Sequence, residues 1–143
     1  MRVVTVTVVR RGEPRDLGAI IAIQAACSQA AQWDPVGYLN FDLLVATYGI
    51  QVVGFLVGRT LAEGEHELLN LAVAPDHRRR GVGRSLICAY LEASKGTIFL
   101  EVRPSNLPAR SFYKSLGFDE VTLRPGYYEN PSEPAIVMKF HSC

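Results

Sequence analysis

Long apolar runs are missing from this chain. No stretch of its 143 residues reaches the roughly 18 consecutive apolar residues that a membrane-spanning helix requires. Near the start, Arg2 is followed by alternating valine and threonine, with neither an apolar signal core nor a small-residue cleavage site. We therefore expect a protein that makes no contact with a membrane and stays in the cytoplasm.

An excess of charge is also missing. The sequence has 15 Lys and Arg against 14 Asp and Glu, a formal net charge of +1, so no overall field attracts nucleic acid. At 48% hydrophobic and 20% charged residues, the composition is that of a globular protein rather than a disordered chain. The length favours one domain over residues 1–143.

Cysteine and histidine are too few and too scattered to indicate a metal site. Cys27, Cys88 and Cys143 follow no metal-ligand spacing, and their odd number is typical of reduced thiols. Cys88 lies among apolar residues, so we expect it in the core. The histidines are expected at the surface. No Gly-x-Ser-x-Gly elbow is present, and no cysteine has a histidine partner in sequence, which disfavours nucleophilic catalysis.

Hydrophobic periodicity predicts a strand-rich chain with three helices. Strands are expected at residues 3–9, 41–48, 51–60, 67–73, 97–102, 118–123 and 135–140, and helices at 13–26, 83–94 and 106–115. The first helix should bury one stripe, formed by Leu17, Ile20, Ile21 and Ile23, and residues 29–38 are predicted as a loop or short helix. A hairpin turn is expected at Gly49-Ile50, and Gly117 should end the last helix. The order β-α-β-β-β-α-β-α-β-β predicts an α/β (α+β) fold with a mixed central sheet of about seven strands flanked by helices.

The most informative segment is an arginine- and glycine-rich loop between a predicted strand and a predicted helix. Residues 71–84 read Leu-Ala-Val-Ala-Pro-Asp-His-Arg-Arg-Arg-Gly-Val-Gly-Arg. Backbone N–H groups at the start of a helix, next to arginine and without a Cβ at the glycines, suit a pyrophosphate. The spacing matches neither a P-loop nor the dinucleotide fingerprint. A merely solvated loop is the simple alternative, and nucleic-acid binding through Arg78 to Arg84 is a second one.

Candidate catalytic groups lie in the C-terminal half. Glu101 interrupts an apolar strand, where it meets water, pairs with a cation such as Arg103, or accepts a proton in catalysis. Tyr113 shares a helical face with Ala109, Phe112 and Leu116, a pattern that a simple core stripe also produces. Residues 124–128, Arg-Pro-Gly-Tyr-Tyr, form an aromatic loop that could line a polar substrate.

Two motifs in this order are similar to those of a known family. The first is Val73-Ala-Pro75-x-x-Arg78-x-x-Gly81-x-Gly83, and the second is Glu101-Val-Arg-x-x-Asn106-x-x-Ala109-x-x-x-Tyr113-x-x-x-Gly117-Phe118. Together they resemble the GCN5-related N-acetyltransferase (GNAT) superfamily. The segments around Glu101 and from Arg124 to Met138 resemble its ribosomal-protein-alanine N-acetyltransferases and their protein N-terminal relatives.

The resemblance implies acetyl-CoA as the acetyl donor, and the scattered His and Cys residues indicate no metal. The donor would be held by strand residues, by the loop and by the last helix, namely Leu71, Ala72, Val73, Arg78, Arg79, Arg80, Gly81, Val82, Gly83, Arg84, Ser85, Asn106 and Ala109. Within the loop, Arg78 matches the motif position, while the other residues would bind the pyrophosphate mainly through backbone N–H groups.

The resemblance also implies direct transfer of the acetyl group in a ternary complex. Glu101 would be the general base, with Glu67 acting through water as the other candidate, and Tyr113 would be the general acid. Tyr127 and Tyr128 would bind the acceptor, an amine that is expected to be a protein N-terminus.

Two alternative functions stay open at this stage. A small amine, such as an amino acid, a polyamine or an antibiotic, could be the acceptor, and the chain could instead be a non-catalytic CoA-binding module. Pro134 stands where relatives carry an acidic residue, and the compact polar segment 27–40 replaces a clearer second helix, so the acceptor is open. Homodimer formation is open as well.

Overall fold

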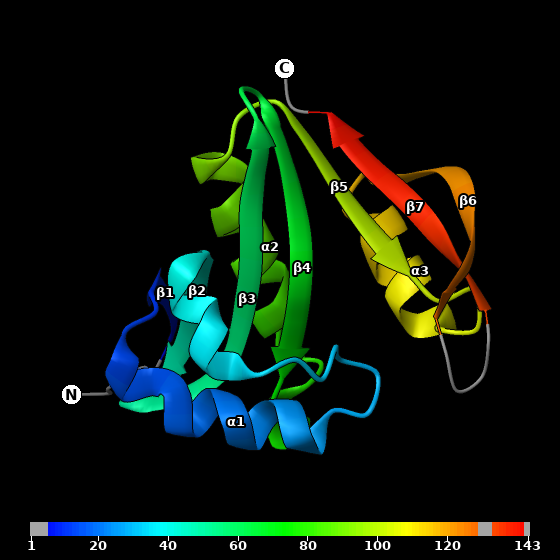
Figure 1. Cartoon of the computed structure of the whole chain (residues 1–143). Coiled ribbons are helices and arrows are strands. Elements are labelled where there is room, and N and C mark those ends of the chain that lie inside the picture. The colour runs from blue at the N-terminus through cyan, green and yellow to red at the C-terminus, as the bar shows by residue number, and fades with distance from the viewer. Residues whose placement is uncertain (1–5, 129–132, 142–143) are drawn as a thin grey trace. The chain divides into compact units, whose positions relative to one another are not determined.

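The computed structural model describes residues 6–128 and 133–141, and for residues 126–128 it describes the backbone only. Its main elements are β1 (Thr7–Arg11), α1 (Leu17–Ala26), β2 (Asp42–Tyr48), β3 (Gln51–Ala62), β4 (Glu65–Val73), α2 (Val82–Ala93), β5 (Thr97–Val102), α3 (Leu107–Ser115), β6 (Asp119–Tyr128) and β7 (Glu133–His141) (Figure 1). Short 3-10 helices are η1 (Pro14–Asp16), η2 (Pro35–Asn40) and η3 (Pro75–His77). Within the described residues the strands form a seven-stranded mixed sheet in the order β1-β2-β3-β4-β5-β7-β6, which confirms the predicted fold class and element order.

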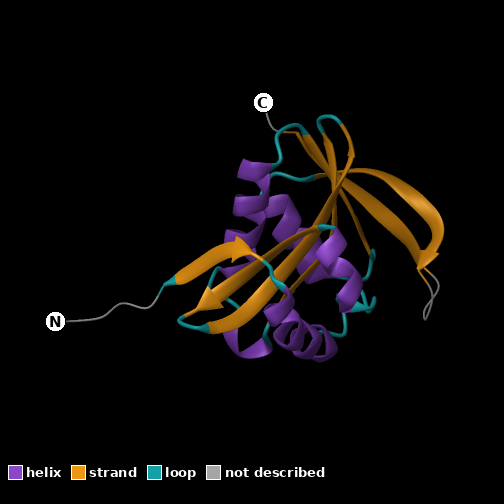
Figure 2. Cartoon of the chain, turned by 60° about the vertical axis from the view of Figure 1, so that its left-hand side comes forward, coloured by secondary structure: helices purple, strands orange, loops and turns teal. Residues whose placement is uncertain are grey.

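The chain divides into two compact units, which are described separately. Unit 1 comprises Met1–Arg59 and Leu69–Ala93, and unit 2 comprises Thr60–Leu68 and Ser94–Cys143. Strands β3 and β4 each contribute residues to both units, and α1 and α2 belong to unit 1 while α3 belongs to unit 2. Figure 2 distinguishes these helices, in purple, from the orange strands.

In unit 1 the strands carry helices on opposite faces because alternate residues of β3 point in opposite directions. Phe55 and Val57 belong to the buried cluster that includes Ile20 and Ile23 of α1. Gly58, the residue after Val57, faces α2, where a Cβ would come within 2.3 Å of the Tyr90 hydroxyl. The missing side chain therefore makes room for the helix to pack closely on the strand.

Two expectations about burial in unit 1 were wrong. Ile21 is 50% exposed, and the buried face of α1 contains Gln24 instead. Cys88 is exposed rather than part of the core, because α2 turns Val82, Leu86 and Tyr90 inward. The predicted first helix also begins as the 3-10 turn η1 before the α-helix starts at Leu17.

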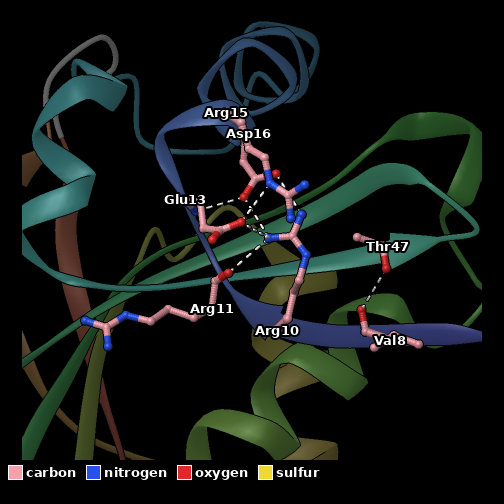
Figure 3. A network of polar contacts seen from close by, with 7 residues as sticks. All are labelled: Val8, Arg10, Arg11, Glu13, Arg15, Asp16 and Thr47. Atoms are coloured by element: carbon pink, nitrogen blue, oxygen red, sulfur yellow. Dashed lines mark hydrogen bonds and ion pairs between the residues drawn. The ribbon is translucent and has the colours of Figure 1, made fainter.

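A buried carboxylate fixes the corner between β1 and α1. Asp16 is 4% exposed and accepts two hydrogen bonds of 2.8 Å from the guanidinium of Arg10, together with one of 2.8 Å from the N–H of Glu13 (Figure 3). The hydrogen bonds from Arg10 lower the pKa of Asp16 against the opposing effect of burial. The bidentate pair thus compensates the carboxylate for the loss of water.

Replacing Asp16 with asparagine is expected to lower the free energy of unfolding by about 2 kcal/mol, the contribution of a hydrogen bond to a charged group. Denaturant unfolding at pH 7 measures this loss. Arg15→Gln is the matched control: Arg15 and Glu13 are 2.7 Å apart but 72% and 52% exposed, so less than about 0.5 kcal/mol should be lost.

The pH dependence of stability follows from the lowered pKa of Asp16. Its contribution is complete above the unfolded pKa of about 3.9 and is lost as the pH falls through the lower folded pKa. The stability difference between wild type and Asp16→Asn should therefore shrink below about pH 4. A difference that stays constant during acidification would contradict this assignment.

In unit 2, β7 lies between β5 and β6, antiparallel to both, and the start of β4 pairs in parallel with β5. Along β5, Ile98, Leu100 and Val102 are buried, and Glu101 lies on the opposite face of the strand. Strand β6 is longer than expected: it continues through Pro125 and Gly126 to Tyr128, with an irregular register between Arg124 and Tyr128. Such an irregularity accommodates the missing N–H of a proline within a strand.

Candidate active site

The loop that connects β4 to α2 in unit 1 has a backbone suited to anions. Arg79 has a φ of +62°, unusual for a residue with a side chain, and Gly81 has a φ of +77°. Positive φ angles in a turn direct successive N–H groups to one side, and the first-turn N–H groups of α2, which begins at Val82, have no acceptor within the helix. The backbone thus presents a concave set of donors at the positive end of a helix dipole.

Side chains of this loop add positive charge and rigidity. Arg78, Arg79, Arg80 and Arg84 are all exposed. Arg78 also reaches back, with Nη2 3.4 Å from the Sγ of Cys27, and the thiol of Cys27 donates to the carbonyl of Val73. The Ser85 hydroxyl donates to the carbonyl of Gly81 at 2.9 Å, which ties the loop to the helix.

A buried polar network holds the end of β4 against segment 27–40. The Tyr38 hydroxyl donates to Gln24 Oε1 at 2.6 Å, and the Asn70 amide donates to Gln24 and to Tyr38. Burial raises the pKa of Tyr38. Asn70 Oδ1 accepts from the N–H groups of Ala31 and Leu71. One backbone donor of the strip Leu71–Val73 is therefore already engaged within the protein.

In unit 2, the two oxygens of the Glu101 carboxylate have different surroundings. Oε1 accepts a hydrogen bond of 2.9 Å from Nη1 of Arg124, while Oε2 is buried and has no hydrogen-bond partner among the described residues. The Glu101 side chain is 15% exposed and that of Arg124 is 61% exposed. The cation paired with Glu101 is thus Arg124, in place of the suggested Arg103.

Arg103 belongs to a second cluster that shapes the loop between β5 and α3. Its guanidinium donates to Glu133 at 2.9 Å, and the backbone N–H and hydroxyl of Ser105 donate to the same carboxylate. The hydrogen bond from Arg103 is the main reason that the pKa of Glu133 is lowered. Next in sequence, Asn106 caps α3 by accepting from the N–H of Ala109. The loop after Glu101 is therefore held at both of its ends.

Tyr113 lies in an aromatic row at the end of α3. Its ring centroid is 5.4 Å from that of Phe112 and 5.7 Å from that of Phe118. The half-buried face formed by Ala109, Phe112, Tyr113 and Leu116 agrees with the predicted stripe. Gly117, with a φ of +104°, ends the helix, and the N–H of Phe118 donates to the carbonyl of Tyr113. These contacts fix the position of the Tyr113 ring.

The comparison with known proteins identifies the family. Residues 19–118 match the model of the acetyltransferase (GNAT) family. The chain is a GNAT acetyltransferase. It is 38% identical over 107 residues to the ribosomal protein bS18-alanine N-acetyltransferase of Escherichia coli K12, covering 71% of this chain and 70% of that protein. The Salmonella typhimurium protein of the same name is 39% identical over 107 residues, with the same coverage.

Solved structures agree with this family. Ard1 of Thermoplasma volcanium superposes with a TM-score of 0.86 at 30% identity, covering 96% of this chain and 98% of that one. The ribosomal-protein-S18-alanine N-acetyltransferase of Escherichia coli superposes with a TM-score of 0.82 at 29% identity, covering 96% of both chains. The predicted family, its subgroup resemblance and the enzyme class are confirmed.

The remaining candidate residues of this acetyltransferase lie on β4 and β6. Glu67 is half-buried on β4, opposite Phe99 of β5. Tyr127 and Tyr128 lie on β6, but their side chains lie outside the described residues. Among the residues that are described, no cluster of His, Cys, Asp and Glu is arranged to hold a metal ion, and no helix is long and apolar enough to cross a membrane.

Sequence reasoning missed three contributors to these sites. The sequence motifs include Arg124 and Glu133, but they indicate neither the pairing of Arg124 with Glu101 nor the pairing of Glu133 with Arg103. The positive φ of Arg79 was also unforeseen. The one available signal was the presence of Arg124 and Glu133 in the segment that resembles the relatives.

Proposed function

We propose that this acetyltransferase transfers an acetyl group from acetyl-CoA to the α-amine of a protein N-terminus, with residues 1–143 acting as one domain. The acceptor is inferred from the 38% identity of this chain to an enzyme named for acetylating an alanine of ribosomal protein bS18. The residue types of the two described units support the chemistry: an anion-binding loop in one, and a carboxylate and a phenol in the other.

The loop after β4 holds the donor through its pyrophosphate. Its positive φ angles, exposed arginines and helix N-terminus fit two adjacent phosphates. Gly81 has open space where a Cβ would lie, which leaves room for the anion. In this proposal the backbone of Leu71–Val73 in unit 1, and Asn106 and Ala109 in unit 2, bind the pantetheine arm.

An acceptor that arrives as an ammonium group loses two protons, one before the attack and one as the amide forms, and one proton must reach the leaving thiolate. Bound acetyl-CoA supplies a thioester whose carbonyl carbon the neutral amine attacks, forming the C–N bond as the C–S bond breaks. Glu101, or Glu67 through water, accepts the proton from the ammonium group. Tyr113 donates its hydroxyl proton to the departing thiolate and regains one through solvent, which takes up the second proton of the nitrogen. No acyl-enzyme forms, because the amine attacks the thioester directly. Tyr127 and Tyr128 contact the acceptor backbone.

The test is an acetylation assay with matched peptides. A peptide that begins with alanine and contains one internal lysine should release CoA in step with acetylation, and fragmentation mass spectrometry should locate the acetyl group on the N-terminal amine. The same peptide with a blocked N-terminus should release none. Acetylation only of the lysine, only of free amino acids or polyamines, or of none of these acceptors would refute the proposal.

A further inference from the structure

The ion pair between Glu101 and Arg124 spans three strands of unit 2. Glu101 of β5 is opposite Val137 of β7, and Arg124 of β6 is opposite Ala135 of the same strand. Directly opposed residues of antiparallel strands share a face, and residues two apart on one strand share a face as well. Glu101 and Arg124 are therefore on the same face, and the arginine reaches diagonally across β7.

The strand between them leaves a path for the arginine. Ala135, directly opposite Arg124, is fully buried and has a side chain of one methyl group. The long Arg124 side chain can lie along this apolar surface with its charged end at Glu101. The contact at 2.9 Å has the length of a charge-assisted hydrogen bond.

The carboxylate is held at one oxygen only. Oε1 is bound to Arg124, whereas Oε2 is shielded from water and has no partner within the described part of the chain. A buried carboxylate oxygen without a donor has lost water and gained no hydrogen bond, so a donor that reaches it is bound strongly. An ammonium group of the acceptor is such a donor.

We propose that Arg124 is a positioning residue for Glu101: it fixes the carboxylate through Oε1 and leaves Oε2 to receive the proton of the acceptor amine. The inference rests on the proposed function, in which Glu101 is the base. One proton moves from the acceptor nitrogen to Oε2, the nitrogen keeps its electron pair for the attack, and Arg124 keeps all of its protons.

The exposure of Arg124 predicts that its loss affects the rate of the reaction more than the stability of the fold. Because Arg124 is 61% exposed, the pair contributes little to folding, as is usual for ion pairs with a solvated partner. Orientation of a reacting group has a far larger effect on rate, since a displacement of about 1 Å can cost about 100-fold. Removing the guanidinium should therefore reduce turnover without a comparable loss of stability.

The kinetic experiment uses residues 1–143 as one chain, with the peptide that begins with alanine. Arg124→Gln should lower kcat by roughly 10- to 100-fold while the Kd for acetyl-CoA stays unchanged. Arg124→Lys, which keeps a cationic donor, should recover kcat to within about threefold of wild type. Glu120→Gln is the matched control. Glu120 lies on the same strand as Arg124, and the substitution removes its ion pairs with Arg110 and Lys114 of α3. This variant should leave kcat unchanged.

A double-mutant cycle shows whether Arg124 acts through Glu101. In a Glu101→Gln background, the Arg124→Gln change should alter kcat by less than about twofold, because the group it positions is already absent. An equal loss in both backgrounds would overturn the proposal and indicate direct contact between Arg124 and the substrate.

A structural measurement tests the same proposal without an acceptor. In crystals of Arg124→Gln, the Glu101 carboxylate should leave the orientation that it has beside Arg124, and thermal unfolding of the variant should remain close to wild type. An unchanged carboxylate, or an unchanged kcat, would overturn the positioning role. If wild type failed to acetylate the peptide while the crystals showed the displaced carboxylate, only the proposed acceptor would be wrong.

Discussion

Replacing Tyr113 with phenylalanine is expected to lower kcat by about 100-fold or more, the usual contribution of a positioned general acid. The substitution removes one oxygen, and the ring keeps its contacts with Phe112 and Phe118. Without the phenol, CoA must leave as an unprotonated thiolate or take its proton from water. Steady-state release of CoA measures kcat, and calorimetric titration with acetyl-CoA should give a Kd equal to that of wild type.

Tyr48→Phe is the matched control for this experiment. It also removes a single phenol oxygen, from a ring whose centroid is 5.7 Å from that of His77, and it should leave kcat unchanged. An unchanged kcat in Tyr113→Phe would remove Tyr113 from the role of general acid. A weaker acetyl-CoA complex with unchanged kcat would instead assign the hydroxyl to binding.

Elements defined by local signals were predicted correctly. The hairpin at Gly49-Ile50 is confirmed by the pairing of Tyr48 with Gln51, because a two-residue turn determines its own register. The end of α3 at Gly117 is confirmed as well, since a helix followed by glycine closes through two backbone hydrogen bonds. In each case the residues that define the feature are neighbours in sequence.

Burial was harder to predict where the local pattern is weak. Helix α1 reads Leu-Gly-Ala-Ile-Ile-Ala-Ile-Gln-Ala-Ala, so it is apolar on nearly every side and periodicity cannot identify its inner face. The structure exposes Ile21 and buries Gln24. Gln24 is satisfied there by Tyr38 and Asn70, which lie 14 and 46 residues away along the chain. No local window of sequence contains those partners.

In the candidate site, too, local features were predictable from the sequence and long-range contacts were not. The motif residues Glu101, Asn106 and Tyr113 lie on the predicted elements, because their spacing follows strand and helix geometry. The pairing of Glu101 with Arg124 depends instead on the registers of two strand pairs, and β6 has irregularities on both sides of the segment from Thr122 to Arg124. A one-residue slip reverses which face a side chain occupies. Such a contact can be derived from coordinates but not from composition or spacing.

Replacing Gly81 with alanine is expected to raise the Kd for CoA at least tenfold, a loss of about 1.4 kcal/mol, within the range for hydrogen bonds to a charged group. The φ of +77° at Gly81 costs about 1–2 kcal/mol for a residue with a Cβ. The loop can relieve this strain by rotating toward negative φ, which turns its N–H groups away from the pyrophosphate. No described atom lies within 4 Å of the added methyl group, so packing is unaffected.

Gly49→Ala is the control that separates a loss of CoA binding from a loss of stability caused by backbone strain. Gly49 has a φ of +63°, and its Cβ position is equally open, but it lies in the turn between β2 and β3. Both variants should lose similar amounts of thermal stability, because both place alanine in the left-handed region. Only Gly81→Ala should weaken CoA binding in calorimetric titration. Equal Kd values in the two variants would mean that the loop after β4 does not bind the pyrophosphate, whereas a selective loss at Gly81 ties the unusual backbone of this loop directly to the donor.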